Sequence, residues 1–370
     1  MKKVKTVTFH LANNYGALLQ AFALQQILQK KYDAEILNYD NTFISDNYRV
    51  FKPINKNPIK TIYHLFKDII NYNQEKKRVL AFDNFRKKLY LSDYFSDKDE
   101  KKLPEVDAYI VGSDQVWNPF LTNGVDSIYT LKDVKKSKKI SYAASSGNLK
   151  YIEQYKTEFL KNIQQFDAIS VREKNLKEYL SKNLKGKTVS TVLDPTLLLS
   201  KNEWINLCKD KKIEKEKYIF VYSVNNANSL FYDFVNKLAD DKNLKIVFFD
   251  KRDLKNHFKH KKKSYYSAGP SEFLNLLYNA EYVITTSFHG TALSCLLNKE
   301  FFVILSTFPD RLTTLLNALD LNSRIISNIN DYNSVLQQRI QWENINQKLE
   351  QERRFSIKWL FNSIESDQDE

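Results

Sequence analysis

The stretch Tyr282-Val-Ile-Thr-Thr-Ser-Phe-His-Gly-Thr-Ala-Leu-Ser-Cys-Leu-Leu297 decides the fold class of this chain. Its apolar start is typical of a buried strand, and the apolar run after Gly290 has the composition of a helix. The polar residues between them predict a tight turn. The first backbone N–H groups of a helix are unpaired and, together with the helix dipole, favour a bound anion. We therefore expect a ligand site at this corner of an α/β sheet.

His289 stands in this turn, next to Gly290. A histidine can give or take a proton near neutral pH. A glycine lets the backbone approach a ligand closely. The same residues also suit a histidine that is hydrogen-bonded in a turn or packed in the core. The spacing alone does not distinguish a ligand-binding histidine from a structural one. The residues at the other predicted strand ends are therefore needed as further evidence.

The composition indicates a globular protein of two domains. The chain has 370 residues, which exceeds the usual size of one hydrophobic core. Its two cysteines are too few for a disulfide framework or a zinc cluster, as is usual in the reducing cytoplasm. The amino terminus lacks the apolar core of a signal peptide. No stretch reaches the roughly 20 apolar residues of a membrane span. We expect a cytoplasmic protein.

The net charge of +13 favours anionic partners. Phosphorylated small molecules, anionic lipid surfaces and nucleic acid all carry suitable charge. Part of the excess is a lysine-rich solvated surface. Charge alone therefore does not choose the partner.

The pattern along the chain predicts two Rossmann-like domains. A strand over 4–9, a helix and a second strand open a βαβ unit. We assign residues 1–199 to an N-terminal Rossmann-like domain with a helical excursion at 41–103. Residues 200–340 form a C-terminal Rossmann-like domain that carries the Ser-Phe-His-Gly turn. Residues 341–370 form a C-terminal helix and an acidic tail.

Polar side chains follow the predicted strands, where α/β sheets place their ligands. Arginines at two of these places suit a phosphate or a carboxylate, which a guanidinium binds through two parallel hydrogen bonds. Each candidate also has a structural alternative: Asp114 suits a helix cap or turn, Arg172 with Glu173 a surface ion pair, and Arg311 a helix start. The candidates are Asn13, Asn14, Asp114, Gln115, Arg172, Glu173, Ser287, His289, Gly290 and Arg311.

Several standard sites are missing from the sequence. Neither G-x-x-x-x-G-K-[ST] nor G-x-G-x-x-G occurs, which argues against a P-loop NTPase and an ordinary dinucleotide-binding domain. A G-x-S-x-G nucleophile elbow is also absent. The five histidines have no metal-ligand spacing with the cysteines. We predict neither a metal site nor a cofactor.

Six short motifs, taken in order, resemble those of the polysaccharide pyruvyl transferases. The resemblance runs from the amino-terminal strand to about residue 324, and the excursion at 41–103 lies outside the motifs. That excursion is a place for acceptor-specific structure. The motifs are Asn13-Asn-Tyr-Gly-Ala-Leu-Leu-Gln20, Val111-Gly-Ser-Asp-Gln-Val-Trp117, Val171-Arg-Glu173, Asp194-Pro-Thr-Leu-Leu-Leu199, Ser287-Phe-His-Gly290 and Arg311-Leu-Thr-Thr-Leu-Leu316.

The resemblance implies two Rossmann-like domains that face each other across a cleft, as in GT-B enzymes. It implies phosphoenolpyruvate as the donor, without a cofactor, and a sugar in a glycan or lipid-linked precursor as the acceptor. Pyruvate would form a ketal with two hydroxyls of the sugar, and phosphate would be released. Such reactions belong to bacterial exopolysaccharide and cell-wall biosynthesis.

The resemblance also suggests a role for each candidate. His289 would be the general acid, and Asp114 a base or an anchor for an acceptor hydroxyl. Arg172 would bind the donor anion. The remaining donor contacts would be Arg311, Ser287 and Gly290, and the acceptor contacts Asn13, Asn14, Gln115 and Glu173.

Two other functions stay open at this stage. A GT-B glycosyltransferase that uses a nucleotide sugar would share the fold. A basic module that binds nucleic acid or anionic membrane would share the charge. We prefer the pyruvyl transferase, without a nucleic-acid partner. Peripheral contact with the inner face of the membrane is a further expectation, at about 1 kcal/mol for each well-placed Lys or Arg.

Overall fold

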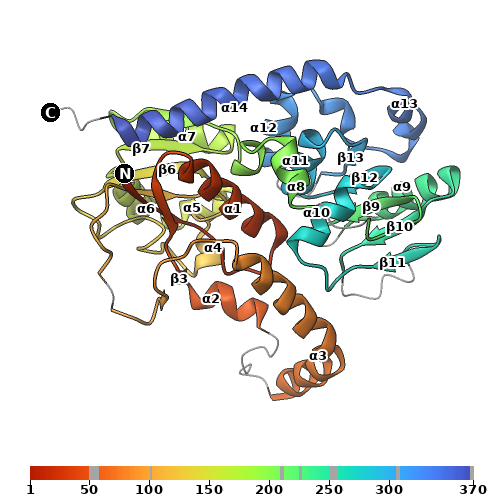
Figure 1. Ribbon diagram of the computed structural model, residues 1–370, viewed down its shortest axis with the longest axis horizontal. Helices are drawn as coiled ribbons and strands as arrows, with labels where there is room; N and C mark the ends of the chain where they lie inside the picture. Colours follow the sequence, from red (N-terminus) through yellow and green to blue (C-terminus); the bar gives the residue numbers. More distant parts are fainter. Residues whose placement is uncertain are drawn as a thin grey trace. The chain divides into compact units, whose positions relative to one another are not determined.

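The computed structural model describes residues 1–49, 58–100, 102–208, 212–224, 227–250, 257–305 and 309–366, without the side chains of 58–70 (Figure 1). Internal contacts divide the chain into two compact units. The first unit is Met1–Leu199 with Glu352–Glu370, and the second is Ser200–Gln351. Each unit is described by itself. The predicted tail beyond residue 366 lies outside the described residues.

The first unit is built on a six-stranded parallel sheet in the order β2-β1-β5-β6-β7-β8. The chain runs outward from β1 to β2 and then returns to the other side of β1 with β5. The switch point of the topology therefore lies between β1 and β5, where open α/β sheets bind ligands. The strands are β1 (Lys3–Val7), β2 (Asp33–Ile36), β5 (Ala108–Val111), β6 (Lys138–Ala144), β7 (Ala168–Val171) and β8 (Val189–Thr191).

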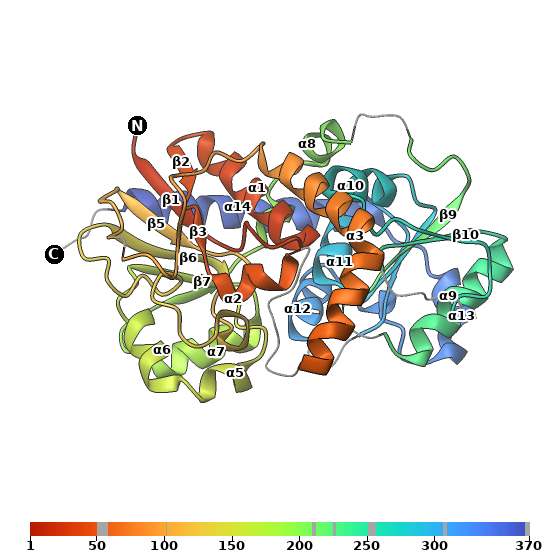
Figure 2. The same ribbon diagram turned by 90° about the horizontal axis from the view of Figure 1, so that it is seen from below.

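Helices cover both faces of this sheet, and Figure 2 shows α6 and α7 on one side and α1 on the other. Covering on both faces explains why the central strands are continuous apolar runs. A small parallel ribbon joins β3 (Tyr39–Asp40) to β4 (Phe95–Ser96). The helices are α1 (Tyr15–Gln29), α2 (Thr42–Ser45), α3 (Pro58–Arg86), α4 (Pro119–Thr122), α5 (Leu149–Glu153), α6 (Lys156–Ile163) and α7 (Lys174–Asn183).

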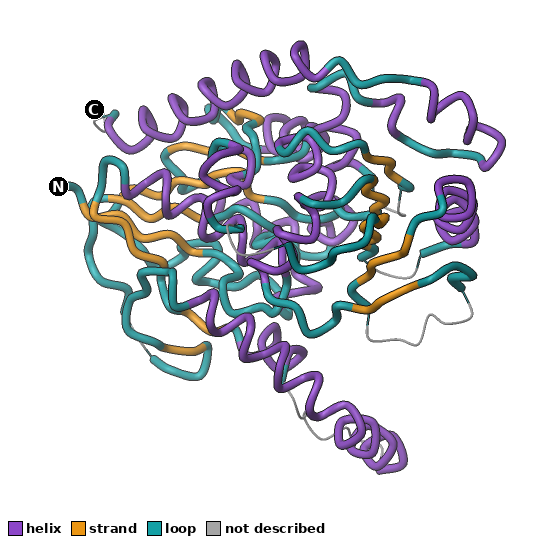
Figure 3. Tube along the Cα trace, turned by 45° about the vertical axis from the view of Figure 1, so that its right-hand side comes forward, coloured by secondary structure: helices purple, strands orange, loops and turns teal. Residues whose placement is uncertain are grey.

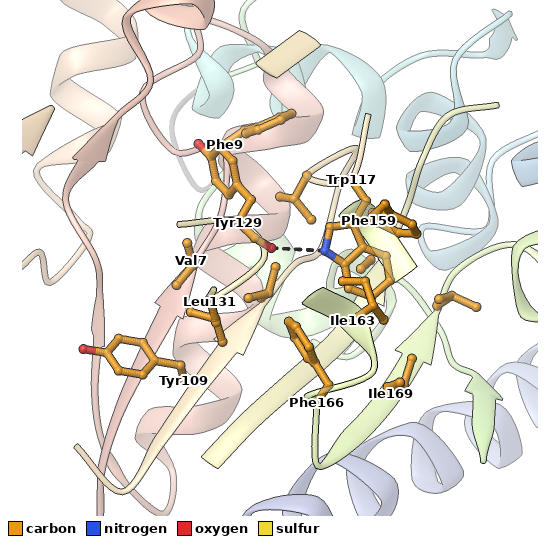
Figure 4. Close-up of a cluster of buried hydrophobic side chains, with 14 of the residues drawn as sticks. Val7, Phe9, Tyr109, Trp117, Tyr129, Leu131, Phe159, Ile163, Phe166 and Ile169 are labelled. Carbon is orange, nitrogen blue, oxygen red and sulfur yellow. Dashed lines mark hydrogen bonds between the residues drawn. The ribbon is translucent and has the colours of Figure 1, made fainter. Parts of the chain in front are cut away.

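The core of the first unit is aromatic (Figure 4). The Trp117 indole Nε1 donates to the carbonyl oxygen of Tyr129 at 3.1 Å, so the buried indole keeps its hydrogen bond. The same indole meets the rings of Phe159 and Phe166 edge-on at 5.6 and 5.9 Å between centroids. This packing fixes the loop that follows β5.

The second unit has a five-stranded parallel sheet in the order β11-β10-β9-β12-β13. Its chain runs outward from β9 through β10 to β11 and returns to β12, so its switch point lies between β9 and β12. Figure 3 shows the strands as orange segments side by side. They are β9 (Tyr218–Tyr222), β10 (Lys245–Phe248), β11 (Lys262–Ser264), β12 (Tyr282–Thr285) and β13 (Phe301–Val303).

Helices alternate with these strands, as expected for βαβ units. Their bounds are α8 (Lys201–Asn206), α9 (Ser229–Lys242), α10 (Pro270–Tyr278), α11 (Phe288–Leu296), α12 (Asp310–Ala318), α13 (Tyr332–Gln337) and α14 (Trp342–Glu365). Short 3₁₀ turns lie at Asp46–Tyr48, Pro195–Leu197, Asn322–Arg324 and Ile329–Asp331.

Helix α14 differs from the separate C-terminal element at 341–370 that the sequence suggested. Its residues up to Gln351 belong to the second unit, and its later turns belong to the first. Ser356 Oγ accepts the backbone N–H of Leu193 at 3.0 Å, and Arg353 Nε donates to the carbonyl oxygen of Leu197 at 2.8 Å. These long-range contacts make the later turns part of the first unit's core.

Candidate active site

The turn after β12 is built across two neighbouring strands. Thr285 Oγ1 donates to the carbonyl oxygen of Tyr222 on β9 at 2.6 Å and accepts the backbone N–H of Ser287 at 3.0 Å. Thr286 Oγ1 accepts the backbone N–H of Val224 at 3.0 Å. The turn therefore sits at the switch point of the second sheet.

Ser287 and Gly290 shape the start of α11. Ser287 is the N-cap, and its Oγ accepts the backbone N–H of Gly290 at 3.3 Å. A Cβ added to Gly290 would lie 2.6 Å from Thr285 Oγ1, so the helix can pack on this strand only with glycine here. Packing and capping account for both residues, and their contact with a donor stays a prediction.

His289 occupies the second position of α11 and is 8% exposed. Its ring meets that of Phe288 edge-on, with 5.2 Å between centroids. The imidazole therefore lies among the first backbone N–H groups of a helix, where the dipole favours negative charge. The predicted strand, turn and helix are confirmed around it.

Arg311 lies in the first turn of α12, which follows β13 and contacts α11. The residue is half-buried. The structure thus brings a cationic side chain to a helix that touches the His289 helix. Both positions follow the carboxyl ends of adjacent strands, β12 and β13.

A buried ion pair lies at the strand ends of the first unit. Arg172 Nη1 donates to Asp194 Oδ2 at 2.7 Å, and Arg172 Nη2 lies 3.7 Å from Asp114 Oδ1. Side-chain exposures are 2% for Arg172 and zero for Asp194. Burial lowers the pKa of Arg172, but the carboxylates of Asp194, Glu173 and Asp114 outweigh it and raise that pKa. The guanidinium is therefore charged.

This arrangement corrects one structural alternative. Arg172 was also compatible with a local surface pair with its neighbour Glu173, yet its hydrogen-bonded partner is the buried Asp194. Sequence reasoning missed Asp194 as a site residue, although the Asp194-Pro-Thr motif was the signal. Its Oδ2 also accepts from Ser113 Oγ at 2.8 Å, and its Oδ1 from the Thr196 backbone N–H and Oγ1.

The segment that carries Asp114 is tied to the switch point between β1 and β5. The backbone N–H of Ser113 donates to Gln20 Oε1 at 3.2 Å, and Thr8 Oγ1 donates to the carbonyl oxygen of Ser113 at 3.2 Å. Gly112 has φ +117°, and a Cβ there would lie 2.2 Å from the carbonyl oxygen of Tyr142. The neighbour of Asp114, Ser113, is thus held by a residue of α1 and by Thr8, which follows β1.

Glu173 and Gln115 belong to the same group of strand ends. Glu173 Oε1 accepts from Ser145 Oγ, and Gln115 Oε1 accepts from Asn118 Nδ2 at 2.8 Å. A Cβ on Gly147, which follows β6, would lie 2.1 Å from Gln115 Oε1. The loops after β5, β6 and β7 therefore meet here.

Asn13 and Asn14 have local tasks. Asn14 is the N-cap of α1, and its Oδ1 accepts the backbone N–H of Ala17 at 3.2 Å. Asn13 Oδ1 accepts from Arg86 Nη2, and its carbonyl oxygen accepts from Arg78 Nη2 at 3.0 Å. Hydrogen bonds from α3 thus hold the loop before α1 in place. Asn13 Nδ2 also donates to the carbonyl oxygen of Tyr48 at 3.5 Å.

A family model for polysaccharide pyruvyl transferase matches residues 14–306, which include the Arg172 ion pair and the His289 turn and end before Arg311. The chain belongs to the polysaccharide pyruvyl transferase family. The resemblance predicted from the six motifs is confirmed. Membership indicates a transferase that acts on polysaccharide. No curated protein matches this pyruvyl transferase sequence.

Several solved structures are similar to this chain in fold. UDP-GlcNAc 2-epimerase from Neisseria meningitidis, bound to UDP-GlcNAc, is similar with a TM-score of 0.54 at 10% identity, over 98% of this chain and 100% of that chain. The corresponding epimerase from Methanocaldococcus jannaschii has a TM-score of 0.52 at 12% identity, over 98% and 100%. UGT89C1 from Arabidopsis thaliana, complexed with UDP-L-rhamnose, has a TM-score of 0.51 at 11% identity, over 98% of each chain.

These likenesses establish a GT-B type of fold with two Rossmann-like units, as the motifs implied. At such identities they carry no information on the substrate. Among the residues that the structure describes, no helix is both long enough and apolar enough to cross a membrane.

Proposed function

We propose that this protein takes a pyruvyl group from phosphoenolpyruvate and forms a ketal with two hydroxyls of one sugar, with release of phosphate. The family match carries this proposal. It is supported by His289 at the start of α11. No cofactor is required, because the donor is already activated as an enol phosphate.

Two of the proposed donor contacts, His289 and Arg311, lie in the second unit. Phosphoenolpyruvate carries a phosphate and a carboxylate, and both suit helix N-termini and a guanidinium. His289 and Arg311 stand in the first turns of α11 and α12, two helices in contact. We assign the donor to these two side chains, with Ser287 and Gly290 shaping the turn.

The proposed chemistry starts with a proton. Protonated His289 gives it to the methylene carbon of the donor, which becomes a methyl group, and the carbon that bears phosphate becomes electrophilic. One sugar hydroxyl attacks that carbon, phosphate leaves, and the second hydroxyl closes the ketal. Of the two hydroxyl protons lost, one replaces the proton from His289 and one leaves with phosphate. General-acid catalysis of this kind contributes on the order of 10²–10⁴-fold.

The first unit would contribute Asp114 and Arg172. Asp114 is the proposed base or hydroxyl anchor, with 12% of its side chain exposed beside Arg172. Arg172 remains a proposed anion ligand, as the resemblance of the Val171-Arg-Glu173 motif implies. Asp194 would set the direction of that guanidinium.

The acceptor would be a sugar in a glycan or lipid-linked precursor. Gln115 and Glu173 are the proposed direct contacts, since they share the strand ends with Asp114. Asn13 and Asn14 would act through the shape of the loop before α1. With a net charge of +13, peripheral contact with an anionic membrane is part of the proposal, and nucleic acid is not.

Thermal shift with phosphoenolpyruvate, UDP and GDP tests the donor. A ligand at 100 times its Kd stabilises the native protein by about 2.7 kcal/mol. We expect a shift with phosphoenolpyruvate that is reduced in His289→Gln and Arg311→Gln. Arg339→Gln is the matched control, because Arg339 is an exposed arginine of the same unit.

A nucleotide-sugar glycosyltransferase is the second candidate, since such an enzyme would share the GT-B type of fold. Two of the three similar structures named above were solved with UDP-GlcNAc or UDP-L-rhamnose. Stabilisation by UDP or GDP, with none from phosphoenolpyruvate, would replace the pyruvyl donor by this candidate. His289 would then need another role.

A further inference from the structure

A pocket of 540 Å³ lies in the first unit, beside the β3–β4 ribbon. We call it the Phe43 pocket. Residues of α2, of the turn after β4 and of the loop after α4 line it, and α2 and α4 are in contact. Part of its wall comes from the predicted excursion at 41–103. Residues of the wall that matter here are Tyr39, Asn41, Phe43, Asp97, Asn123 and Asp126.

The floor of the pocket is fixed before any ligand arrives. Asp126 Oδ2 accepts from Tyr39 Oη at 2.7 Å and from Asn41 Nδ2 at 2.8 Å, and its Oδ1 accepts the backbone N–H of Ile128 at 2.7 Å. Asn41 also caps α2 and donates to the carbonyl oxygen of Thr122 at 3.2 Å. A ligand therefore has little side-chain order to create, which favours affinity.

Phe43 gives the pocket an open aromatic face. It is 47% exposed, although its neighbour Ile44 packs against the core. Around it stand hydrogen-bonding groups: the exposed carboxylate of Asp97 and the exposed amide of Asn123. Pockets with an aromatic wall and a few placed polar groups are typical of small-molecule sites. Sugar rings combine C–H faces with hydroxyl donors, and carboxylate oxygens accept from such donors.

The negative charge of the pocket wall favours neutral ligands over anionic ones. It holds five carboxylates and one lysine, the acids being Asp97, Asp99, Glu100, Asp126 and Asp133 and the lysine Lys102. Like charges repel, so the wall disfavours an anionic ligand such as phosphoenolpyruvate. A neutral, hydroxyl-rich ligand fits the wall.

Tyr129 connects the pocket to the proposed catalytic group of this unit. Its backbone N–H donates to Asp126 Oδ1 at 3.1 Å, and its carbonyl oxygen accepts from Trp117 in the loop of Asp114. Burial raises the pKa of Tyr129 well above its ordinary value, and the negative charges of Asp126 and Asp114 add to this effect. Asp126 of the pocket wall and Trp117 of the Asp114 loop thus hydrogen-bond to the same buried tyrosine.

We propose that the Phe43 pocket binds a neutral sugar residue of the acceptor glycan, with the ring of Phe43 against one face of the sugar and Asp97 accepting from its hydroxyls. This proposal rests on the proposed function. It makes the pocket a subsite for a sugar next to the one that receives pyruvate.

Saturation-transfer NMR on the full chain tests the subsite, with the methyl glycosides of galactose, glucose and mannose as probes. We expect transfer from aromatic protein protons to the ring protons of at least one glycoside. The signal should be lost in Phe43→Ala and weakened in Asp97→Asn. Phe355→Ala is the matched control, because Phe355 is a 50% exposed phenylalanine of the same unit outside the pocket. All variants should keep the wild-type melting temperature without ligand.

The outcomes separate the two proposals. No transfer to any glycoside at its solubility limit, or a signal unchanged in Phe43→Ala, overturns the subsite. Stabilisation by Mn²⁺ or Ca²⁺ that is lost in Asp97→Asn also overturns it, since the pocket would then hold a cation. The thermal shift with phosphoenolpyruvate is read on the same samples. Saturation transfer to a glycoside, without a thermal shift from phosphoenolpyruvate, would reject the pyruvyl donor and retain the pocket as a sugar-binding site.

Discussion

Removal of the Arg172 guanidinium is the most informative single change, because its partner Asp194 is fully buried. In Arg172→Ala the carboxylate of Asp194 loses a 2.7 Å hydrogen bond and its counter-charge. Breaking a buried pair from one side costs about 3–5 kcal/mol. Asp194 keeps Ser113 and Thr196 as donors, which places the expected loss near 3 kcal/mol.

The loss should be local to the first unit. The two units can unfold separately, so one global midpoint would mix them. Hydrogen exchange of peptides from β7 and β8 in increasing urea measures the first unit alone. In Arg172→Ala with Asp194→Asn the buried negative charge is gone, so this double variant should be more stable than Arg172→Ala alone.

A loss below about 1 kcal/mol in Arg172→Ala would refute this reasoning, since that is the size expected of an exposed pair. The result also matters for function. Loss of donor binding in Arg172→Ala could come from the missing guanidinium or from a displacement of the strand ends that it holds. Arg172→Lys, which keeps a positive charge at this place, is the better variant for binding.

Three other changes test separate parts of the structure. His289→Gln should lower the rate of acceptor-dependent phosphate release by about 10²–10⁴-fold in a direct phosphate assay, while the circular dichroism stays unchanged. Gly290→Ala should destabilise the second unit by about 1–3 kcal/mol in urea, because the new Cβ would lie 2.6 Å from Thr285 Oγ1. Burial alone would raise the pKa of Glu214, but Lys245 and its neighbours lower it to about 2. The ionised Glu214 contributes about 1–3 kcal/mol to the free energy of unfolding above pH 4.5, and this contribution is lost as the pH falls towards 2. The difference in stability between the wild type and Glu214→Gln should therefore disappear over that pH range.

The regular elements could be predicted from the sequence because their signals are local. Apolar runs such as Tyr109–Val111 are typical of parallel strands covered on both faces, and the periodic segment after Gly16 is typical of a helix. The turn around His289 could also be predicted, since strand, N-cap and helix follow one another in the chain. Boundaries were less exact: the first strand ends at Val7 instead of residue 9.

The partners of the site residues could not be predicted. Arg172 and Asp194 are 22 positions apart, and Arg86 reaches Asn13 across 73 positions. Such pairs form only when strand order brings distant loops to the same edge of a sheet. The sequence pattern suggested only the adjacent Glu173 as an ion-pair partner of Arg172, not Asp194.

The sequence by itself determined the α/β class, the family and the position of polar groups at strand ends, because periodicity, caps and motifs act over a few residues. The tertiary structure alone decided that Asp194 is buried against Arg172 and that Asn13 is held by α3. It also decided that residues as far apart in the sequence as Tyr39 and Asp133 line the Phe43 pocket. These features depend on which strands become neighbours. That choice follows from the burial of the whole core, which no local stretch encodes.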